Sequence, residues 1–166
     1  MRRELAYFQI VTEVYFWDPT DPAYELARPV AERLMLLMQD FIRYDSWVLS
    51  GSLIRWGNDL IPFFDLIVVL YVEPELRLQR LQEREYERYG ERILKGGDLY
   101  EKSRAFLEWA AAYDDENSGI GRIYSRHMQW IEMLRNQLDI PVLEIRGDVP
   151  LEYSVETVLS AMDSRS

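Results

Sequence analysis

Five arginines of this chain are spaced so that, in a helix, they would lie along one face. Arg77, Arg80, Arg84, Arg88 and Arg92 are separated by three, four, four and four residues, which places them on one helical face. Arginines four residues apart repel each other by about 0.2–0.5 kcal/mol. A ligand with several negative charges would turn this repulsion into attraction, because guanidinium groups match phosphate oxygens. The arginine stripe therefore predicts a binding site for a polyanion.

The same arginines are also compatible with a solvated surface. Glu73, Glu83 and Glu87 each lie three or four residues from one of them, so a ladder of ion pairs along the helix would neutralise the stripe. Such surface ladders are common and contribute little stability. The spacing alone leaves both interpretations open.

The stripe follows an apolar run at residues 66–72 that is rich in β-branched side chains. Such a run is typical of a strand buried on both faces of a parallel sheet. Pro74 cannot continue a central strand but suits the first turn of a helix. We therefore expect the arginine helix to begin at the carboxyl edge of a sheet, which is where open α/β sheets bind ligands.

Length and composition limit the possibilities further. A chain of 166 residues with 48% hydrophobic residues can form one domain with a sizeable core. The 19 basic and 29 acidic residues give a net charge of −10, which argues against nucleic acid or an anionic membrane as the main partner. The absence of cysteine excludes disulfides and zinc–thiolate sites, and a single histidine excludes a multi-histidine metal site. We predict no metal site and, without a signal peptide or transmembrane stretch, a cytoplasmic location.

The rest of the chain alternates between strand and helix patterns. We expect strands at residues 7–11, 47–49 and 141–145, and helices ending near residue 5, beginning at Pro29, and covering about 98–113, 118–138 and a C-terminal segment around 155–162. Strands separated by helices indicate a parallel sheet covered on both sides.

Two short segments are candidate parts of a site. Residues 50–52 end a strand with Ser-Gly-Ser, which lets another backbone or a ligand come close, although a simple turn explains them equally well. The aromatic triplet at 15–17 lies beside Asp18 and Asp21. It either lines a ligand pocket or packs into the core.

Taken together, these segments resemble bacterial P-loop proteins of the adenylate-kinase-like class, which are often labelled AAA-family ATPases. The resemblance rests on residues 47–52, 64–66, 70–81 and 84–92, and residues 15–17, 19–22, 141–143 and 147–148 look similar too. It implies an α/β fold of the nucleoside-monophosphate-kinase type, a parallel sheet flanked by helices that is incomplete at its N-terminus. Residues 1–166 would form a single domain with a helical lid at about 90–117.

The resemblance also implies an activity and its residues. The protein would be an ATP-dependent phosphotransferase with ATP and Mg²⁺, acting on a nucleotide or small phosphorylated molecule. Arg84 and Arg88 would be catalytic. The nucleotide and its phosphates would be bound by Arg80, Arg84, Arg122, Arg126 and Gly147. The acceptor side would comprise Glu13, Asp18, Gly51, Ser52 and Arg55.

One departure from this pattern changes the expected function. The chain has no Gly-x-x-x-x-Gly-Lys-Ser/Thr motif, whose amides and lysine hold the phosphates and whose hydroxyl binds Mg²⁺. We therefore expect a nucleotide-binding protein whose phosphotransferase activity is impaired or lost. The alternative is a non-catalytic protein-interaction scaffold with the same fold. A metal-dependent hydrolase using Asp18, Asp21 and Asp59 ranks third, since their spacing is not that of metal ligands.

The missing motif carries a structural expectation as well. In the resembled fold its strand lies between the strand that ends at Ser50 and the strand at 66–72. Leaving it out would expose unpaired amides and carbonyls, which is costly. Either these two strands pair directly, or the chain is an N-terminally shortened form of a longer protein.

Overall fold

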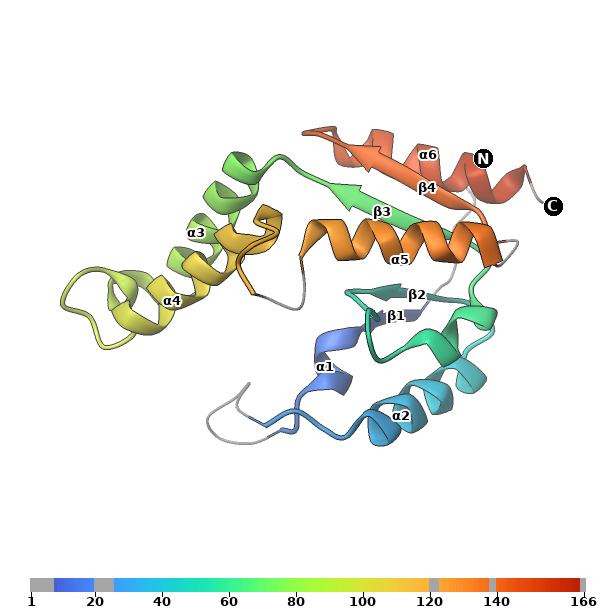
Figure 1. The fold of residues 1–166 in the computed structure, drawn as a ribbon, viewed down its shortest axis with the longest axis horizontal. Coiled ribbons are helices and arrows are strands. Elements are labelled where there is room, and N and C mark those ends of the chain that lie inside the picture. Colours follow the sequence, from blue (N-terminus) through green and yellow to red (C-terminus); the bar gives the residue numbers. More distant parts are fainter. Residues whose placement is uncertain (1–7, 20–25, 120–122, 138–139, 165–166) are drawn as a thin grey trace. The chain divides into compact units, whose positions relative to one another are not determined.

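A computed structural model describes residues 8–19, 26–119, 123–137 and 140–164. These residues form a mixed α/β structure with two small parallel sheets and several helices (Figure 1). The chain divides into two compact units, Met1–Phe64 and Asp65–Ser166, which we call the N-terminal unit and the C-terminal unit. The expectation of a single domain with a lid at about 90–117 stays a prediction.

The N-terminal unit contains one pair of parallel strands with helices between them. Its elements in chain order are β1 (Phe8–Val11), α1 (Thr12–Phe16), α2 (Val30–Arg43), β2 (Trp47–Ser50) and η1 (Asn58–Phe63). The register places Phe8 opposite Trp47 and Val11 opposite Ser50. Leu37 and Phe41, on the apolar face of α2, are buried, and the ring of Phe41 stacks on that of Trp47 with 3.8 Å between centroids. Burial of Leu37 and Phe41 agrees with the apolar spacing of this helix, whereas Val30 and Ile42, which fit the same spacing, are 44% and 81% exposed.

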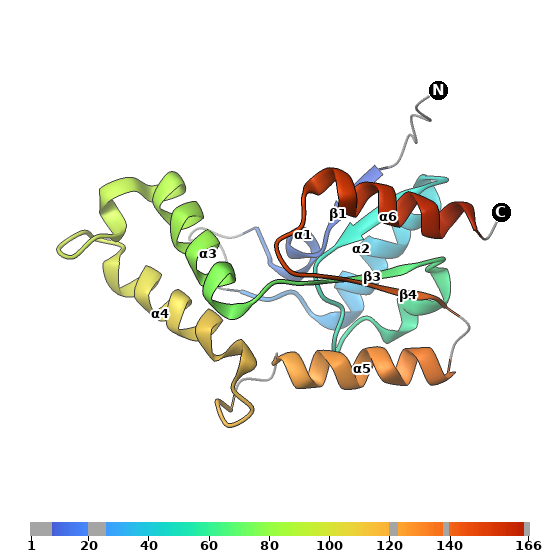
Figure 2. The same cartoon turned by 90° about the horizontal axis from the view of Figure 1, so that it is seen from above.

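The C-terminal unit is built around a second pair of parallel strands. Its elements are β3 (Ile67–Tyr71), α3 (Pro74–Tyr89), η2 (Gly90–Ile93), α4 (Tyr100–Ala111), η3 (Ala112–Asp114), α5 (Tyr124–Gln137), β4 (Val142–Arg146) and α6 (Leu151–Asp163). Helices α5 and α6 lie on opposite sides of the strand pair, and α3 lies beside α4 (Figures 1 and 2). Ile131, Leu134 and Ile145 form the buried interior of this unit together with Ile123.

Helix α3 carries the arginine stripe and has well-defined ends. Pro74 occupies its first turn, where a missing N–H costs nothing. Gly90 ends it with a φ of 60°, a conformation that glycine adopts readily. Arg92 consequently lies outside the helix, in η2. The prediction that all five arginines share one helical face is thus wrong for Arg92, because the helix stops one turn too early.

The sheet differs from the prediction in two respects. Strand β2 pairs with β1 and β3 pairs with β4, so the described residues form two sheets. Direct pairing of β2 with β3, one of the two alternatives expected from the missing motif, is not among these pairs. Val68 and Leu70 on β3 are 36% and 69% exposed, so the predicted burial on both faces is wrong. Successive side chains of a strand point to opposite faces, and in this pair of strands only the face of Ile67, Val69 and Tyr71 is partly covered.

The other elements agree with the prediction in type and differ at their ends. The strands near residues 8, 47 and 142 and the helices beginning near residues 30, 100 and 124 are confirmed. The five-residue helix α1 and the 3-10 helix η1 were not among the predicted elements. The expected helix that ends near residue 5 lies outside the described residues. None of the described helices has both the length and the apolar character needed to cross a membrane.

Candidate functional site

The carboxyl ends of β3 and β4 lie side by side because the two strands are parallel and in register. Tyr71 is opposite Arg146. The amide of Gly147 donates a hydrogen bond of 2.9 Å to the carbonyl of Tyr71. Gly147 has a φ of 88°, which is favourable without a Cβ atom. The glycine thus ties the loop after β4 to the end of β3.

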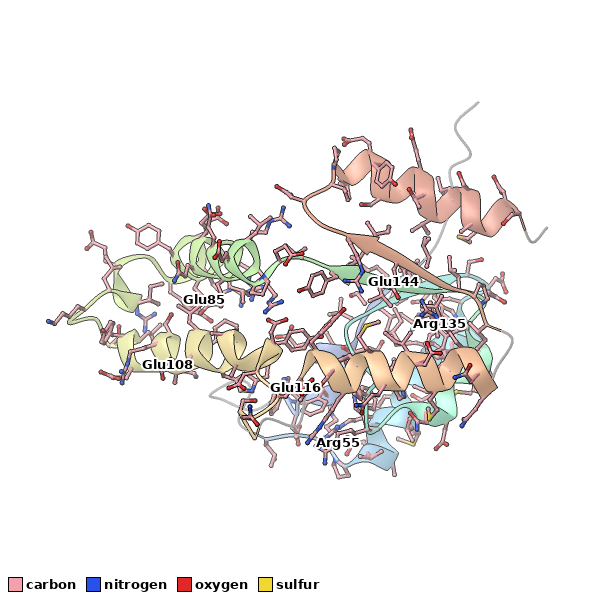
Figure 3. All side chains as sticks on the ribbon, turned by 45° about the horizontal axis from the view of Figure 1, so that its top comes forward. Arg55, Glu85, Glu108, Glu116, Arg135 and Glu144 are labelled. Carbon is pink, nitrogen blue, oxygen red and sulfur yellow. The ribbon has the colours of Figure 1, made fainter. Side chains whose placement is uncertain are left out.

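Two guanidinium groups share one carboxylate at this edge. Arg135 donates a 2.8 Å hydrogen bond to Oε1 of Glu144, and both residues are labelled in Figure 3. Arg146 donates a hydrogen bond of 3.1 Å to Oε2 of the same carboxylate. Arg146 also donates to the hydroxyl of Tyr124 at 2.9 Å. The hydrogen bond from Arg135 is the main reason that the pKa of Glu144 is lowered. Arg135 also lies 3.6 Å from Glu132, so two carboxylates accompany the two guanidinium groups at this edge.

Aromatic rings surround these arginines. The ring centroids of Tyr71 and Tyr124 are 4.9 Å apart, and those of Tyr113 and Tyr124 are 6.2 Å apart. Arg146 lies 5.0 Å from the ring centroid of Tyr71, and Arg77 lies 4.9 Å from that of Tyr113. We call these five residues the tyrosine–arginine cluster. They offer flat surfaces and cationic groups, which together can hold a planar anionic ligand.

The first two arginines of the stripe form ion pairs with aspartates from other segments. Arg77 forms an ion pair with Asp114, which connects α3 to η3. Its guanidinium also donates a hydrogen bond of 3.3 Å to the carbonyl of Val72. Arg80 pairs with Asp148 in the loop after β4, and both side chains are more than half exposed, at 51% and 62%. Arg77 is therefore part of the framework, whereas Arg80 is accessible.

The ladder of glutamates along the helix, one of the two interpretations of the stripe, does not supply the ion-pair partners of Arg77, Arg80 and Arg92. Arg92 donates two hydrogen bonds to Asp98, of 3.0 and 2.6 Å, so its partner too is an aspartate beyond α3. The pairs of Arg77 and Arg80 connect segments 37 and 68 residues apart, which no spacing along a single helix predicts.

The remaining residues predicted to bind the nucleotide are in the C-terminal unit. Arg84 and Arg88 are exposed on α3, and Arg88 lies 5.9 Å from the ring centroid of Tyr89. Arg126 is exposed on α5, and Arg122 lies outside the described residues. Their catalytic and binding roles stay predictions.

The residues predicted for the acceptor side all belong to the N-terminal unit. Glu13 is exposed on α1, and Asp18 donates through its amide to Leu26 at 2.8 Å. Ser52 accepts the indole N–H of Trp56 on its carbonyl. What comes close to Gly51 is the side chain of Thr12 in the same unit.

Arg55 is the one described non-glycine residue with a positive φ, 71°. This conformation is costly for residues with a Cβ atom and often occurs at functional sites. Its guanidinium is exposed (Figure 3).

Several residues of the cluster, and Arg135 beside it, were not among those predicted from the sequence. Tyr71 and Arg146 lie at the carboxyl ends of strands that were predicted to be parallel. Because ligands bind at this end of open α/β sheets, the position of the two residues could have indicated a site. Tyr124 and Arg135 come from α5, and only the packing of that helix brings them to Glu144 and Arg146. Nothing in the sequence singled them out.

The described residues contain no group of three or more histidine, aspartate or glutamate side chains that could hold a metal ion. The single histidine, His127, has Nδ1 at 3.1 Å from the carbonyl of Ile123 and 3.3 Å from the hydroxyl of Tyr113. These are packing contacts within the C-terminal unit.

Comparison with known proteins shows the family of the chain. It is 35% identical over 164 residues to the uncharacterized protein YqaC of Bacillus subtilis (strain 168), and the match covers 99% of this chain and 88% of the relative. The chain belongs to the same family as YqaC. No protein-family model matches it, and no solved structure matches it.

These findings correct the interpretation of the sequence as an adenylate-kinase-like P-loop protein. Neither a family model nor a solved structure connects the chain with that class, and the relative found is uncharacterized. The segments behind the resemblance are short strand–helix units with amphipathic patterns. Many unrelated α/β proteins share such patterns, because the patterns follow from burial against a sheet.

The shared carboxylate gives a pH-dependent prediction. We expect Glu144→Gln to lower the free energy of unfolding at about pH 7 by roughly 1 kcal/mol or less, since the pair is partly exposed. The pKa of Glu144 is lowered in the folded protein. Its contribution is therefore present above the unfolded pKa, about 4.3, and is lost as the pH falls through the lower folded value.

Urea denaturation of both proteins from about pH 7 to about pH 3 measures this effect. The difference between variant and wild type should shrink toward the acidic end. Glu132→Gln is the matched control, because Glu132 approaches Arg135 only at 3.6 Å and is mostly exposed. A difference that is unchanged at low pH would contradict the role of the carboxylate charge.

Proposed function

We propose that this protein binds a nucleotide or another small phosphorylated molecule at the tyrosine–arginine cluster. The observation that carries the proposal is the sharing of Glu144 by Arg135 and Arg146 beside the rings of Tyr71 and Tyr124. Guanidinium groups bind phosphate oxygens through charge-assisted hydrogen bonds. Tyrosine rings provide faces on which a base can stack.

Arg80 supports the same proposal because its present partner is easy to exchange. An exposed ion pair such as Arg80–Asp148 contributes about 0–1 kcal/mol. A hydrogen bond to a charged group contributes about 1.5–3 kcal/mol. A phosphate could therefore replace Asp148 at little cost, in the loop that Gly147 holds against β3.

The proposal concerns binding, and it assigns no Mg²⁺ ligands to the protein. The described residues gather no carboxylate set for a metal. A magnesium ion that accompanied ATP would be held mainly by the phosphates and by water.

Isothermal titration with ATP and Mg²⁺, and separately with AMP, tests the proposal. We expect saturable binding that weakens about tenfold or more in Arg80→Ala and in Arg146→Ala, which corresponds to about 1.4 kcal/mol. Arg104→Ala is the matched control, because Arg104 is an equally exposed helical arginine paired with Glu101. No heat and no thermal shift at roughly millimolar nucleotide, or an equal loss in Arg104→Ala, would refute the proposal.

A protein-interaction scaffold is the second candidate. It is favoured by the apolar side chains that α6 leaves exposed, namely Leu151, Tyr153, Val155 and Met162. Exposed apolar groups at this density can mark an interaction surface. If the protein is such a scaffold, we expect no response to nucleotide. We expect it to bind a protein partner, and Leu151→Ser and Val155→Ser should abolish this binding.

A further inference from the structure

The N-terminal unit contains a buried cation that forms no ion pair with any of the described residues. Arg33, in the first turns of α2, is only 8% exposed. Its Nε donates to the carbonyl of Arg28 at 2.7 Å. Among the described residues, which leave out 20–25, no carboxylate forms an ion pair with it. Buried arginines are normally paired with an acid, because an uncompensated charge in the interior is costly.

The guanidinium of Arg33 lies against two aromatic side chains. It is 3.7 Å from the ring centroid of Phe16 and 5.5 Å from that of Trp56. A cation over an aromatic face is stabilised by about 0.5–2 kcal/mol, which offsets part of the cost of burial. The rings supply no anion, so the two terminal nitrogens still need hydrogen-bond acceptors.

The terminal nitrogens of Arg33 remain within reach of solvent. Among the described residues, every side-chain nitrogen or oxygen that is fully buried has a hydrogen-bond partner, and only Nε of Arg33 has a protein acceptor there. Both Nη atoms must therefore be accessible, although the side chain as a whole is buried. Burial also lowers the pKa of this guanidinium, as expected where no neighbouring acid stabilises the charge.

The residues around Arg33 are held in place by hydrogen bonds of their own. The amide of Arg28 donates to the carbonyl of Phe16 at 2.9 Å, and its guanidinium donates to the carbonyl of Val14 at 2.7 Å. The indole of Trp56, itself buried, donates to the carbonyl of Ser52 at 3.1 Å. These contacts fix both aromatic walls before any ligand binds, which reduces the entropy lost on binding.

The position of Arg33 near the N-terminus of α2 adds a second electrostatic contribution that favours an anion. The helix has 14 residues and begins after Pro29, and Arg33 is its fourth residue. The first turn carries partial positive charge from unpaired amides. Glu32, the acidic residue of this turn, forms an ion pair with Arg28 at 3.4 Å.

We propose that Arg33, framed by Phe16 and Trp56 at the N-terminal end of α2, binds the phosphate group of a small molecule. The two free Nη groups form a fork that matches two oxygens of a phosphate, and the bound anion would neutralise the buried charge. This site is independent of the tyrosine–arginine cluster, since all its residues belong to the N-terminal unit. Either site can exist without the other.

Inorganic phosphate is the probe that tests this site in the full-length chain. Titration at constant ionic strength, followed by calorimetry, should show saturable binding in the wild type. Binding should weaken about tenfold or more in Arg33→Met, which keeps the length and apolar bulk of the side chain. Arg43→Met is the matched control on the same helix, because Arg43 is exposed and its guanidinium lies over the ring of Tyr44. It should bind phosphate like the wild type.

A second set of measurements distinguishes the Arg33 site from the tyrosine–arginine cluster. Arg80→Ala should leave the Arg33-dependent binding step intact even where nucleotide binding is lost, and Arg33→Met should leave nucleotide binding at the cluster intact. Acetate, whose planar carboxylate carries one charge, should compete poorly with phosphate. Phosphate binding that is equal in Arg33→Met and in the wild type, or that acetate matches, would overturn the proposal.

A measurement on the wild-type protein tests the site without depending on whether the Arg33 variant folds. Phenylglyoxal modifies accessible guanidinium groups, and peptide mass spectrometry reports each arginine separately. We expect phosphate to protect Arg33 from modification while leaving Arg43 reactive. Equal protection of the two arginines, or none at either, would count against a phosphate site at Arg33.

Discussion

Replacing Leu134 by alanine is expected to lower the free energy of unfolding by about 3 kcal/mol. Leu134 lies on α5 and is 1% exposed, in the interior that Ile131 and Ile145 share. Removing its isobutyl group loses the transfer free energy of the side chain and leaves a cavity that the neighbours fill only in part. The change should be visible as a lower midpoint in urea denaturation, with an unchanged slope.

Leu151→Ala is the control for this substitution. Leu151 begins α6 and is 74% exposed, so the same chemical change should cost less than about 0.5 kcal/mol. If Leu134→Ala were as mild as Leu151→Ala, the interior of the C-terminal unit would not be where these contacts place it. The comparison therefore tests the packing of α5 on the strand pair, on which the position of Tyr124 and Arg135 depends.

Gly51→Ala is expected to destabilise the N-terminal unit by about 2–6 kcal/mol. Two costs add up, namely strain from a φ of 122°, about 1–3 kcal/mol, and steric overlap, about 1–3 kcal/mol. A Cβ atom at this position would lie 1.7 Å from Oγ1 of Thr12, which is itself buried. Thermal and urea denaturation of the full-length protein would measure the sum.

Two further variants separate these costs. Gly96 also has a positive φ, 97°, but a Cβ atom there would meet nothing within 4 Å, so Gly96→Ala measures the strain alone. The double variant Gly51→Ala with Thr12→Ala removes the 1.7 Å overlap with Oγ1 but keeps a 2.9 Å approach to Cβ of residue 12, so part of the steric cost should be recovered relative to the sum of the single changes. A cost for Gly51→Ala no larger than that for Gly96→Ala would show that Thr12 does not crowd this turn.

The Gly51 result also bears on how the Ser-Gly-Ser segment is understood. The small residues at the end of β2 were expected to admit a ligand or another backbone, or to form a simple turn. The group that approaches is the side chain of Thr12 at the start of α1. The glycine therefore has a packing role that accounts for its small size without a ligand.

Local patterns in the sequence were sufficient to predict the type of most elements. The apolar run before Pro74 became β3, and Pro74 and Gly90 mark the two ends of α3. The parallel pairing within each unit also followed from the alternation of strands and helices. These features depend on neighbouring residues, on burial of one face and on the restricted dihedrals of proline and glycine, all of which can be read along the chain.

Which strands pair, and which charges meet, depended on the tertiary structure. Nothing local distinguishes β1 from β3 as the partner of β2, since any extended apolar segment offers the same backbone groups. The same holds for the arginines: Arg77 and Arg80 had acidic neighbours at helical spacing, yet they pair with Asp114 and Asp148. Arg33 showed no signal at all in the sequence, because an arginine on an amphipathic helix looks like a surface residue until Phe16 and Trp56 bury it. Electrostatic partners are chosen by distance in space, and the sequence by itself determines only the distance along the chain.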